Sequence, residues 1–326
     1  MKVYITGIDG YLGWTFSKYM REKGHEVYGC DNFFRRNVAN SLVPLVREGG
    51  KGVIKQLDVS DIVALTREFF VVKPDVVVHL GEIPSAPYSM MHNGMTMHTM
   101  SNNILGSLSV LLAMKKSCPE AHLIKLGSMG EYIPSSWYHM TKVIDNKNSE
   151  YMNELTGLRI TNVRQGPVYG VGGRFDYDEI WGTVINRWIT MGVAGHDILL
   201  YGDGRQVRGF LPIQDSMSCL EIIANNPPTE IGVVQVNQYA SKYELLTLAN
   251  MVADLTGVKV RSIDNPRKEK LSYEGAGDNS WLISKGYKPT LNTMAVMREL
   301  MESIKPYRLN IDKEKFIPKV RWNNGP

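Results

Sequence analysis

The sequence predicts an α/β protein, a Rossmann-type doubly wound parallel sheet with a smaller, irregular C-terminal substrate domain. Two observations carry this prediction. Residues 1–165 alternate short β-branched apolar runs with segments of helical spacing. The first apolar run also ends at a glycine-rich turn that opens a helix, an arrangement typical of nucleotide-binding βαβ units. After residue 165 this alternation gives way to stretches rich in Gly, Asp and aromatic residues.

The first unit consists of strand KVYIT (2–6), an amphipathic helix over 12–23, and strand HEVYGCD (25–31). The elements expected next are strand 52–61, helix 62–70, strand 74–81, helix 102–116, strand 121–128, helix 138–155 and strand 158–165. The weaker C-terminal signals are helical spacing near 180–191, a helix over 216–224, a strand over 231–237 and a helix over 241–255. We therefore expect a first domain at 1–165, with part of 205–237 returning to its sheet, and a second domain at 166–326.

Composition is that of a globular enzyme, with 43% hydrophobic and 21% charged residues, which excludes a disordered or fibrous chain. The net charge of +4 is too small for a nucleic-acid-binding surface. Three scattered cysteines form no CxxC pair, so we expect reduced thiols and no metal site. We also expect no secretory leader, no membrane span and a cytoplasmic location.

The glycine-rich turn consists of Gly7, Gly10 and Gly13. Without side chains, it lets the backbone approach a pyrophosphate, and the following helix offers free N–H groups. Asp31 ends the second strand, where its carboxylate can bind ribose hydroxyls and repel a 2′-phosphate, so NAD is favoured over NADP. Arg35 and Arg36 lie nearby in the sequence and leave NADP possible as the cofactor.

Further cofactor contacts are expected around the same strand ends. Asp58, which ends a later strand, could bind the adenine amino group. The remaining residues expected to contact the cofactor are Asp9, Tyr11, Leu12, Asn32, Val59, Leu80, Gly81, Asn103, Tyr138, Lys142 and Val168.

Tyr138 and Lys142 form a YxxxK pair whose side chains share one helix face. The lysine ammonium would lower the pKa of the tyrosine, so that Tyr138 could remove a proton from a sugar hydroxyl while hydride leaves for NAD. Ser128 ends the preceding strand and can bind the same hydroxyl. Tyr19 and Lys23 match the same motif, but we expect surface and structural roles for them.

Together with "VYG" (168–170), these motifs resemble the extended short-chain dehydrogenases/reductases that act on nucleotide sugars. More narrowly, the chain resembles the UDP-sulfoquinovose synthase family along nearly its whole length. The stretches that carry the resemblance are DNFFRR (31–36), GEIPSAPYSM (81–90), KLGSMGEY (125–132), YHMTK (138–142), QGPVYG (165–170), RFDYDEIWGTVINRW (174–188), YGDGRQVRGFLPIQD (201–215) and NPR (265–267).

The resemblance implies a cycle in which NAD oxidises the 4-position of UDP-glucose, water is lost across C5 and C6, sulfite adds, and the hydride returns. Related dehydratases carry Asp-Glu where this chain has Met129-Gly130. Glu131 or His139 is therefore the candidate acid/base at the 5-proton and 6-hydroxyl, while a solvated or capping role for Glu131 is equally open.

The resemblance also implies that Arg208 and Arg267 bind the UDP diphosphate, since a guanidinium matches phosphate oxygens. Gln165, Tyr201 and Gln206 are further candidate substrate-binding residues. Members of the family form dimers, so the resemblance also implies a homodimer built from the helices at 102–116 and 138–155.

The chain departs from the family at three points. Pro84 stands where the family carries an arginine suited to sulfite, KEKLSYEGAG follows Arg267, and the segment between Glu131 and Tyr138 is short. The Met- and His-rich segment SMMHNGMTMHTM (89–100) could indicate copper, but loop and core packing is favoured.

Two alternatives stay open. A UDP-sugar 4-epimerase needs only Ser128, Tyr138 and Lys142, without Glu131 or His139. A non-catalytic module that binds NAD or a nucleotide sugar would not need the intact Ser-Tyr-Lys set at all.

Overall fold

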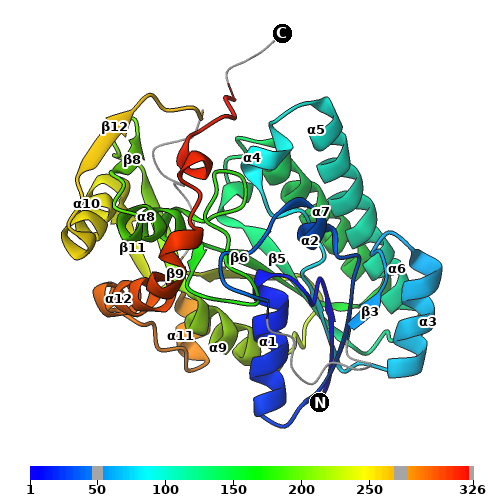
Figure 1. The fold of residues 1–326 in the computed structure, drawn as a ribbon. Coiled ribbons are helices and arrows are strands. Elements are labelled where there is room, and N and C mark those ends of the chain that lie inside the picture. The colour runs from blue at the N-terminus through cyan, green and yellow to red at the C-terminus, as the bar shows by residue number, and fades with distance from the viewer. Residues whose placement is uncertain (46–53, 268–277, 323–326) are drawn as a thin grey trace.

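The computed structural model describes residues 1–45, 54–267 and 278–322. Its centre is a seven-stranded, all-parallel sheet of order β10-β6-β5-β4-β1-β2-β3 (Figure 1). Its strands are β1 (Lys2–Thr6), β2 (Glu26–Asp31), β3 (Ile54–Gln56), β4 (Val76–His79), β5 (His122–Ser128), β6 (Arg159–Gln165) and β10 (Val234–Gln238). The predicted Rossmann-type fold is confirmed. The strand order reverses between β1 and β4, so the carboxyl ends of these two strands border a natural ligand crevice.

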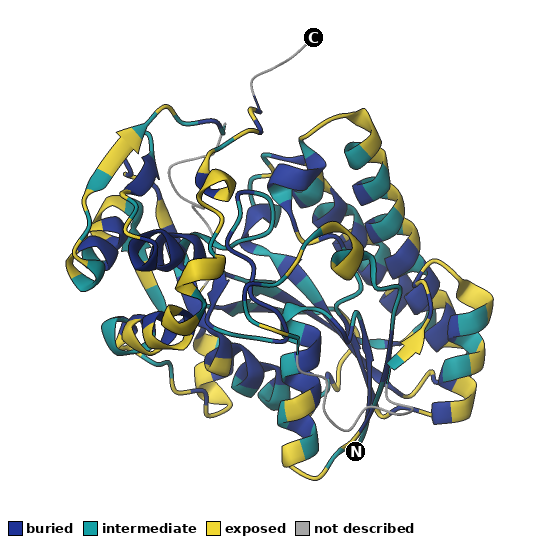
Figure 2. Cartoon of the chain, in the orientation of Figure 1, coloured by how far each residue is buried: buried dark blue, intermediate teal, exposed yellow. Residues whose placement is uncertain are grey.

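Alternating strand residues pack on opposite faces of the sheet. Tyr4, Val77, Leu123 and Ile160 share a core with α3 (Ile62–Val72), α6 (Gly106–Ser117) and α7 (Trp137–Thr156). Residues such as Val3 share the other core with α1 (Tyr11–Glu22), α9 (Ile213–Ala224) and α11 (Ser280–Ser284). These helices bury the sides that face the sheet and expose the others (Figure 2).

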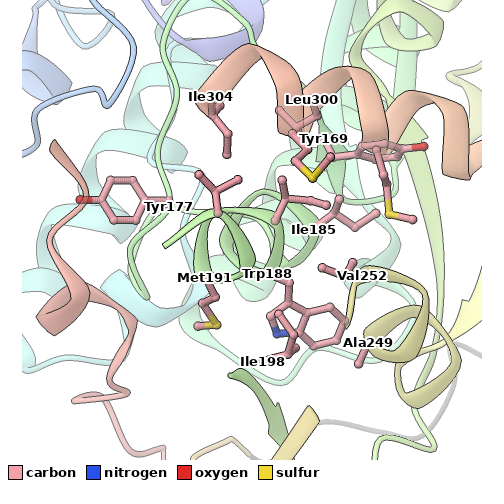
Figure 3. Packing of buried hydrophobic residues seen from close by; sticks show 14 of the residues in the cluster. Tyr169, Tyr177, Ile185, Trp188, Met191, Ile198, Ala249, Val252, Leu300 and Ile304 are labelled. Atoms are coloured by element: carbon pink, nitrogen blue, oxygen red, sulfur yellow. The ribbon is translucent and has the colours of Figure 1, made fainter. Parts of the chain in front are cut away.

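The C-terminal half builds a separate core around α8 (Val184–Val193). Trp188, Ile185 and Ile189 pack against α10 (Leu245–Thr256) and α12 (Thr293–Ile304) (Figure 3). The indole of Trp188 donates to the Leu199 carbonyl at 3.1 Å, which fixes α8 on β8 (Ile198–Tyr201). Two small sheets complete this half, of order β11-β9-β7 and β12-β8. The other strands are β7 (Val168–Tyr169), β9 (Val207–Pro212), β11 (Ser241–Glu244) and β12 (Val260–Ile263).

Several elements differ from the sequence prediction. The helix expected at 102–116 runs without a break from Asn93 to Ser117, as α5 (Asn93–Met100), the π-helical turn η1 (Ser101–Leu105) and α6. Residues 241–244 form a strand rather than the start of a helix. The remaining short elements are α2 (Phe34–Val38), α4 (Ala86–Ser89), η2 (Met129–Glu131), η3 (Lys305–Asn310) and η4 (Lys313–Phe316). The whole KEKLSYEGAG segment (268–277) falls outside the described residues.

The turn between β1 and α1 admits only glycine at two positions. Gly7 has φ +70°, and a Cβ there would lie 2.5 Å from the Leu80 carbonyl oxygen. A Cβ on Gly13 would overlap the Gly7 carbonyl. The turn can therefore press against β4 and leave the N-terminus of α1 open to a ligand.

Candidate active site

A cavity of about 470 Å³ opens at the carboxyl ends of β1, β2, β4, β5 and β6. Following the strand order, its lining runs from Asp31 at the end of β2 and the glycine-rich turn after β1 to Ser128 at the end of β5, and Arg208 on β9 lines it as well. The fold therefore brings most of the predicted cofactor, catalytic and substrate residues to one cavity.

Asp31 lies at the cofactor end of this cavity, with both carboxylate oxygens held by backbone. They accept from the amides of Asp9 at 3.0 Å and Phe33 at 2.7 Å. Burial raises the pKa of Asp31, and those two backbone hydrogen bonds oppose the rise. Each oxygen retains lone pairs for a ribose hydroxyl.

The two arginines that kept NADP open are both engaged in internal ion pairs. Arg36 makes a bidentate pair with Asp9 at 2.5 Å, and Arg35 pairs with Asp176 at 2.9 Å. The Arg35 guanidinium also stacks 3.6 Å from the Trp181 ring centroid. Both guanidiniums are therefore paired with carboxylates of the protein, and the Asp31 carboxylate at the same end of the cavity favours NAD.

An irregular segment from the C-terminal half, residues 170–176, contacts the glycine-rich turn. The Gly173 amide donates to the Tyr11 carbonyl at 3.0 Å, and the Tyr11 hydroxyl donates to the Gly170 carbonyl at 2.9 Å. Arg174, which is 2% exposed, bonds Asp176 and the Ala39 carbonyl. The cofactor end of the cavity is thus covered by chain from both halves.

Most expected cofactor residues line the cavity, and three do not. Asp9 and Asn103 are buried, with Asn103 holding the backbone of Ile83 through bonds of 2.7 and 3.2 Å. The Asp58 carboxylate bonds Asn32 and Ser60 and lines an adjacent surface pocket. The lining cofactor candidates are Gly7, Gly10, Tyr11, Leu12, Gly13, Asp31, Asn32, Arg35, Val59, Leu80, Gly81, Tyr138, Lys142 and Val168.

Ser128, Tyr138 and Lys142 come together in the middle of the cavity. Ser128 ends β5, and its hydroxyl accepts from the Gly130 amide at 3.1 Å. Tyr138 and Lys142 lie one turn apart on α7, with the Lys142 Nζ 5.7 Å from the tyrosine ring centroid. The Nζ also donates to the Leu126 carbonyl at 2.5 Å and pairs with Glu82.

The pKa of Tyr138 differs from the sequence expectation. Burial raises it above its ordinary value, although Lys142 and a hydrogen bond to Ser128 pull it down. Glu82 weakens the effect of Lys142, because its carboxylate opposes phenolate formation. The motif suggested a lone ammonium beside the tyrosine, whereas the fold supplies an ion pair.

Glu131 does not line the cavity. Its carboxylate caps η2 through the Ser128 amide at 2.8 Å and bonds Arg164 at 3.0 Å and Asn162 at 3.1 Å. Its side chain is 5% exposed. The capping role left open by the sequence matches this geometry.

His139 does line the cavity, beside Tyr138 at a ring separation of 5.4 Å. Its Nδ1 accepts from the Ser135 amide at 3.4 Å and lies 3.2 Å from the Ser135 hydroxyl, which holds the ring in place. The ring lies on Gly130, where a Cβ would be 2.5 Å from Nε2. Of the two candidate acid/base groups, only the imidazole reaches the ligand space.

The substrate end of the cavity gathers three arginines. Arg208 on β9 and Arg267 line it as expected, together with Tyr201, Gln206 and Gln165. Arg187 on α8 joins them: it is 4% exposed and donates to the Tyr201 hydroxyl at 2.8 Å. The Arg187 and Arg267 guanidiniums lie 5.5 and 5.4 Å from the Tyr201 ring centroid. Such a cationic end suits a diphosphate.

Gln165 is committed to protein contacts as well as lining the cavity. Its amide donates to the Ser216 hydroxyl at 2.6 Å and to the Gln238 side chain. Gln206 presents the opposite case, because its Oε1 is buried without a hydrogen-bond partner. Gln206 therefore has an acceptor ready for a ligand donor.

Sequence reasoning missed Glu82 and Arg187. Both lie inside stretches that carry the family resemblance, GEIPSAPYSM and RFDYDEIWGTVINRW. That resemblance was the one signal that could have pointed to them. Among the described residues no cluster of three or more His, Cys, Asp or Glu could hold a metal ion. In the same part of the chain, no helix is both long and apolar enough to span a bilayer.

The family model for the NAD dependent epimerase/dehydratase family matches residues 3–234. With the fold and the Ser128–Tyr138–Lys142 site in place, the chain belongs to this family, and NAD is its cofactor class. Within it, the chain belongs to the UDP-sulfoquinovose synthase group, as its curated relatives show.

Two of those relatives are UDP-sulfoquinovose synthases. The chloroplastic protein of Spinacia oleracea is 32% identical over 98% of this chain and 79% of its own length. The Sulfolobus acidocaldarius protein is 32% identical over 99% of this chain and 98% of its own length. The aligned regions span 381 and 383 residues against 326 here, so the relatives carry insertions that this chain lacks.

Among solved structures, the fold is similar to UDP-glucuronic acid 4-epimerase from Bacillus cereus, which was solved in complex with UDP-glucuronic acid and NAD. The TM-score is 0.79 at 20% identity, covering 94% of this chain and 99% of the other. This likeness supports the fold assignment.

Proposed function

We propose that this protein converts UDP-glucose and sulfite into UDP-sulfoquinovose and water, with NAD as a recycled cofactor. The observation that carries the proposal is the single cavity that joins a dinucleotide site, the Ser128–Tyr138–Lys142 set, His139 and a cluster of three arginines. The two curated relatives that are UDP-sulfoquinovose synthases support the same activity.

The residues present fit NAD. The turn has no room for a Cβ at Gly7 or Gly13, Asp31 would accept hydrogen bonds from the adenosine ribose, and the N-terminus of α1 would hold the pyrophosphate. When bound, NAD supplies a hydride acceptor for C4 of the sugar and later a hydride donor to the same carbon. The chain's own residues position the sugar and move the protons.

Tyr138 acts as the base at the sugar 4-hydroxyl, and Ser128 orients that hydroxyl through a hydrogen bond. Once C4 is a ketone, the proton on C5 becomes acidic. Loss of that proton and of the 6-hydroxyl releases water and leaves a C5–C6 double bond. Sulfite then forms the C6–S bond, C5 regains a proton, and reduction at C4 restores the hydroxyl, so the sugar undergoes no net oxidation.

His139 is the group that handles the 5-proton and 6-hydroxyl. Its Nε2 edge lies above Gly130 within the cavity, whereas Glu131 is held by Arg164 and Asn162 outside it. We expect H139N to stop formation of the sulfonated product while partial reduction of bound NAD by UDP-glucose persists. E131Q should instead lower the thermal midpoint and leave most turnover, and the opposite pattern would reassign the role to Glu131.

The experiment that tests the activity is an incubation with NAD, UDP-glucose and sulfite, with products read by mass spectrometry. We expect UDP-sulfoquinovose, which forms only when sulfite is present. UDP-galactose with or without sulfite, or no turnover of any UDP-hexose, would overturn the assignment.

A UDP-sugar 4-epimerase is the second candidate, and one observation favours it. Pro84 lines the cavity at the position where the sulfite-binding arginine was expected, and it brings no charge. An epimerase would interconvert UDP-glucose and UDP-galactose and would retain that activity in H139N. A purely binding role is disfavoured by the complete Ser128–Tyr138–Lys142 set.

We also propose a homodimer through the outer surface of the helices expected at 102–116 and 138–155, which are η1, α6 and α7. Apolar side chains lie exposed on these helices, including Leu105 at 52%, Tyr151 at 63% and Leu155 at 58%. Burying such a surface between two copies would be favourable, and sedimentation of the purified protein tests it. The cytoplasmic location stays a prediction.

A further inference from the structure

Glu82 is the counter-ion of the catalytic lysine, although the two residues are 60 positions apart in the chain. Its Oε2 pairs with the Lys142 Nζ, and the side chains of Lys142 and Glu82 are 3% and 5% exposed. The same Nζ donates to the Leu126 carbonyl at 2.5 Å. A buried ammonium needs such a partner, because removing one member of a buried pair leaves an uncompensated charge.

The second carboxylate oxygen of Glu82 is different. Oε1 is buried and has no hydrogen-bond partner, yet Glu82 lines the cavity beside Gly81. A buried carboxylate oxygen without a donor is unfavourable, which points to a ligand that supplies one. The protein itself therefore leaves one acceptor for a bound molecule.

The order of the strands indicates which donor this is. Glu82 follows β4, which lies in the sheet between β1, which leads into Gly7 and the turn suited to a pyrophosphate, and β5, which ends at Ser128 of the catalytic set. In a nicotinamide dinucleotide the group between the pyrophosphate and the nicotinamide ring is a ribose, which carries hydroxyl donors. Lys142, one helical turn from Tyr138, also lines the cavity and pairs with Glu82.

We propose that Glu82 is a positioning residue that holds the Lys142 ammonium with Oε2 and accepts a hydroxyl of the nicotinamide-side ribose with Oε1. The Glu82–Lys142 ion pair would thus bind the cofactor next to its nicotinamide ring and fix the position of Lys142 relative to Tyr138. The inference rests on the cofactor class, not on the sugar or on sulfite, so it stands or falls independently of the proposed activity.

The test compares ligands with and without that ribose on the holoenzyme. NADH is bound, and its displacement by NAD, ADP-ribose or ADP is followed by nicotinamide fluorescence. ADP-ribose carries the second ribose and ADP does not. In E82Q the amide oxygen must face Lys142, so the NH₂ group replaces the charged acceptor at Oε1.

We expect E82Q to weaken the binding of NAD and of ADP-ribose by about tenfold or more. The affinity for ADP should change by less than about twofold. D215N is the matched control. Asp215 is another buried carboxylate, bonded to Tyr287 at 2.8 Å and Thr290 at 2.6 Å, and it does not line the cavity. D215N should lower the stability of the protein without changing its affinities for the three ligands or their ranking.

Unchanged ADP-ribose binding in E82Q, or an equal loss for ADP and ADP-ribose, would overturn the proposal. E82D keeps the charge but draws the carboxylate back by one methylene. If E82Q does not fold, E82D must lose more affinity for ADP-ribose than for ADP. An equal loss of affinity for both ligands in E82D contradicts the proposal.

Discussion

The imidazole of His139 rests on the backbone of Gly130, so closely that a Cβ there would lie 2.5 Å from Nε2. Gly130 occupies η2, the short turn after Ser128, and His139 is the third residue of α7. The absence of a side chain at residue 130 therefore creates the space in which the candidate acid/base group sits.

Gly130→Ala should move the ring without changing any charge. We expect turnover to fall by about tenfold or more, since misplacing a proton-transfer group removes much of its contribution. The NAD content of the purified protein should stay the same. Gly94→Ala is the control, because Gly94 is helical and its added Cβ would meet only the ring of exposed His92 at 3.2 Å. Full turnover in G130A would show that His139 is not the acid/base group.

Tyr138 should give the hydride step a pH dependence with a definite sign. Only the phenolate accepts the proton, and burial raises the pKa of Tyr138. The rate at which UDP-glucose reduces bound NAD should therefore increase from neutral to alkaline pH. Tyr138→Phe should lower this rate by about 10²–10⁴-fold. Stopped-flow nicotinamide absorbance measures both, and a rate that does not change with pH would contradict a tyrosine base.

Asp31→Ala tests the cofactor preference. Loss of a charged acceptor for the ribose should weaken NAD by about 10–100-fold. The variant should not gain affinity for NADP, because both nearby arginines are already engaged. Arg35 is held by Asp176 and Trp181, and Arg36 is held by Asp9. Titration calorimetry with both nucleotides checks this, and a switch to NADP would show that one of these arginines is available.

Arg187→Gln tests the third cation of the substrate end. Its Nε is buried without a hydrogen-bond partner, as expected of a group that waits for an anion. We expect KM for the UDP-sugar, and Kd for UDP alone, to rise by about tenfold or more with a smaller change in kcat. Arg205→Gln is the matched control, since the Arg205 side chain is 75% exposed and pairs with neighbouring Asp203. Equal effects of the two variants would refute a binding role for Arg187.

The features that the sequence predicted well are local. Gly7, Gly10 and Gly13 follow an apolar run and open a helix, and Tyr138 and Lys142 are four residues apart on one helix, so short spacing alone determines both arrangements. The parallel sheet followed for the same reason, because each βαβ unit has its own hydrophobic period.

The features that it missed depend on contacts between distant segments. Nothing near Glu82 in the chain shows that it would meet Lys142, and nothing near Arg187 shows that it would meet Tyr201. The pKa of Tyr138 was predicted in the wrong direction for the same reason: the motif shows the ammonium but neither the burial nor the carboxylate. Glu131 and His139 could not be ranked until Arg164 and Gly130 were placed beside them.

The central claim is that the hydride removed from the sugar returns to the same carbon after sulfite has added. Incubation of the holoenzyme with UDP-glucose deuterated at C4 and with sulfite tests it directly by mass spectrometry. The account predicts UDP-sulfoquinovose that keeps its deuterium at C4, with no net reduction of NAD. A sulfonated product without the label, NADH accumulating in proportion to product, or UDP-galactose as the main product would contradict it.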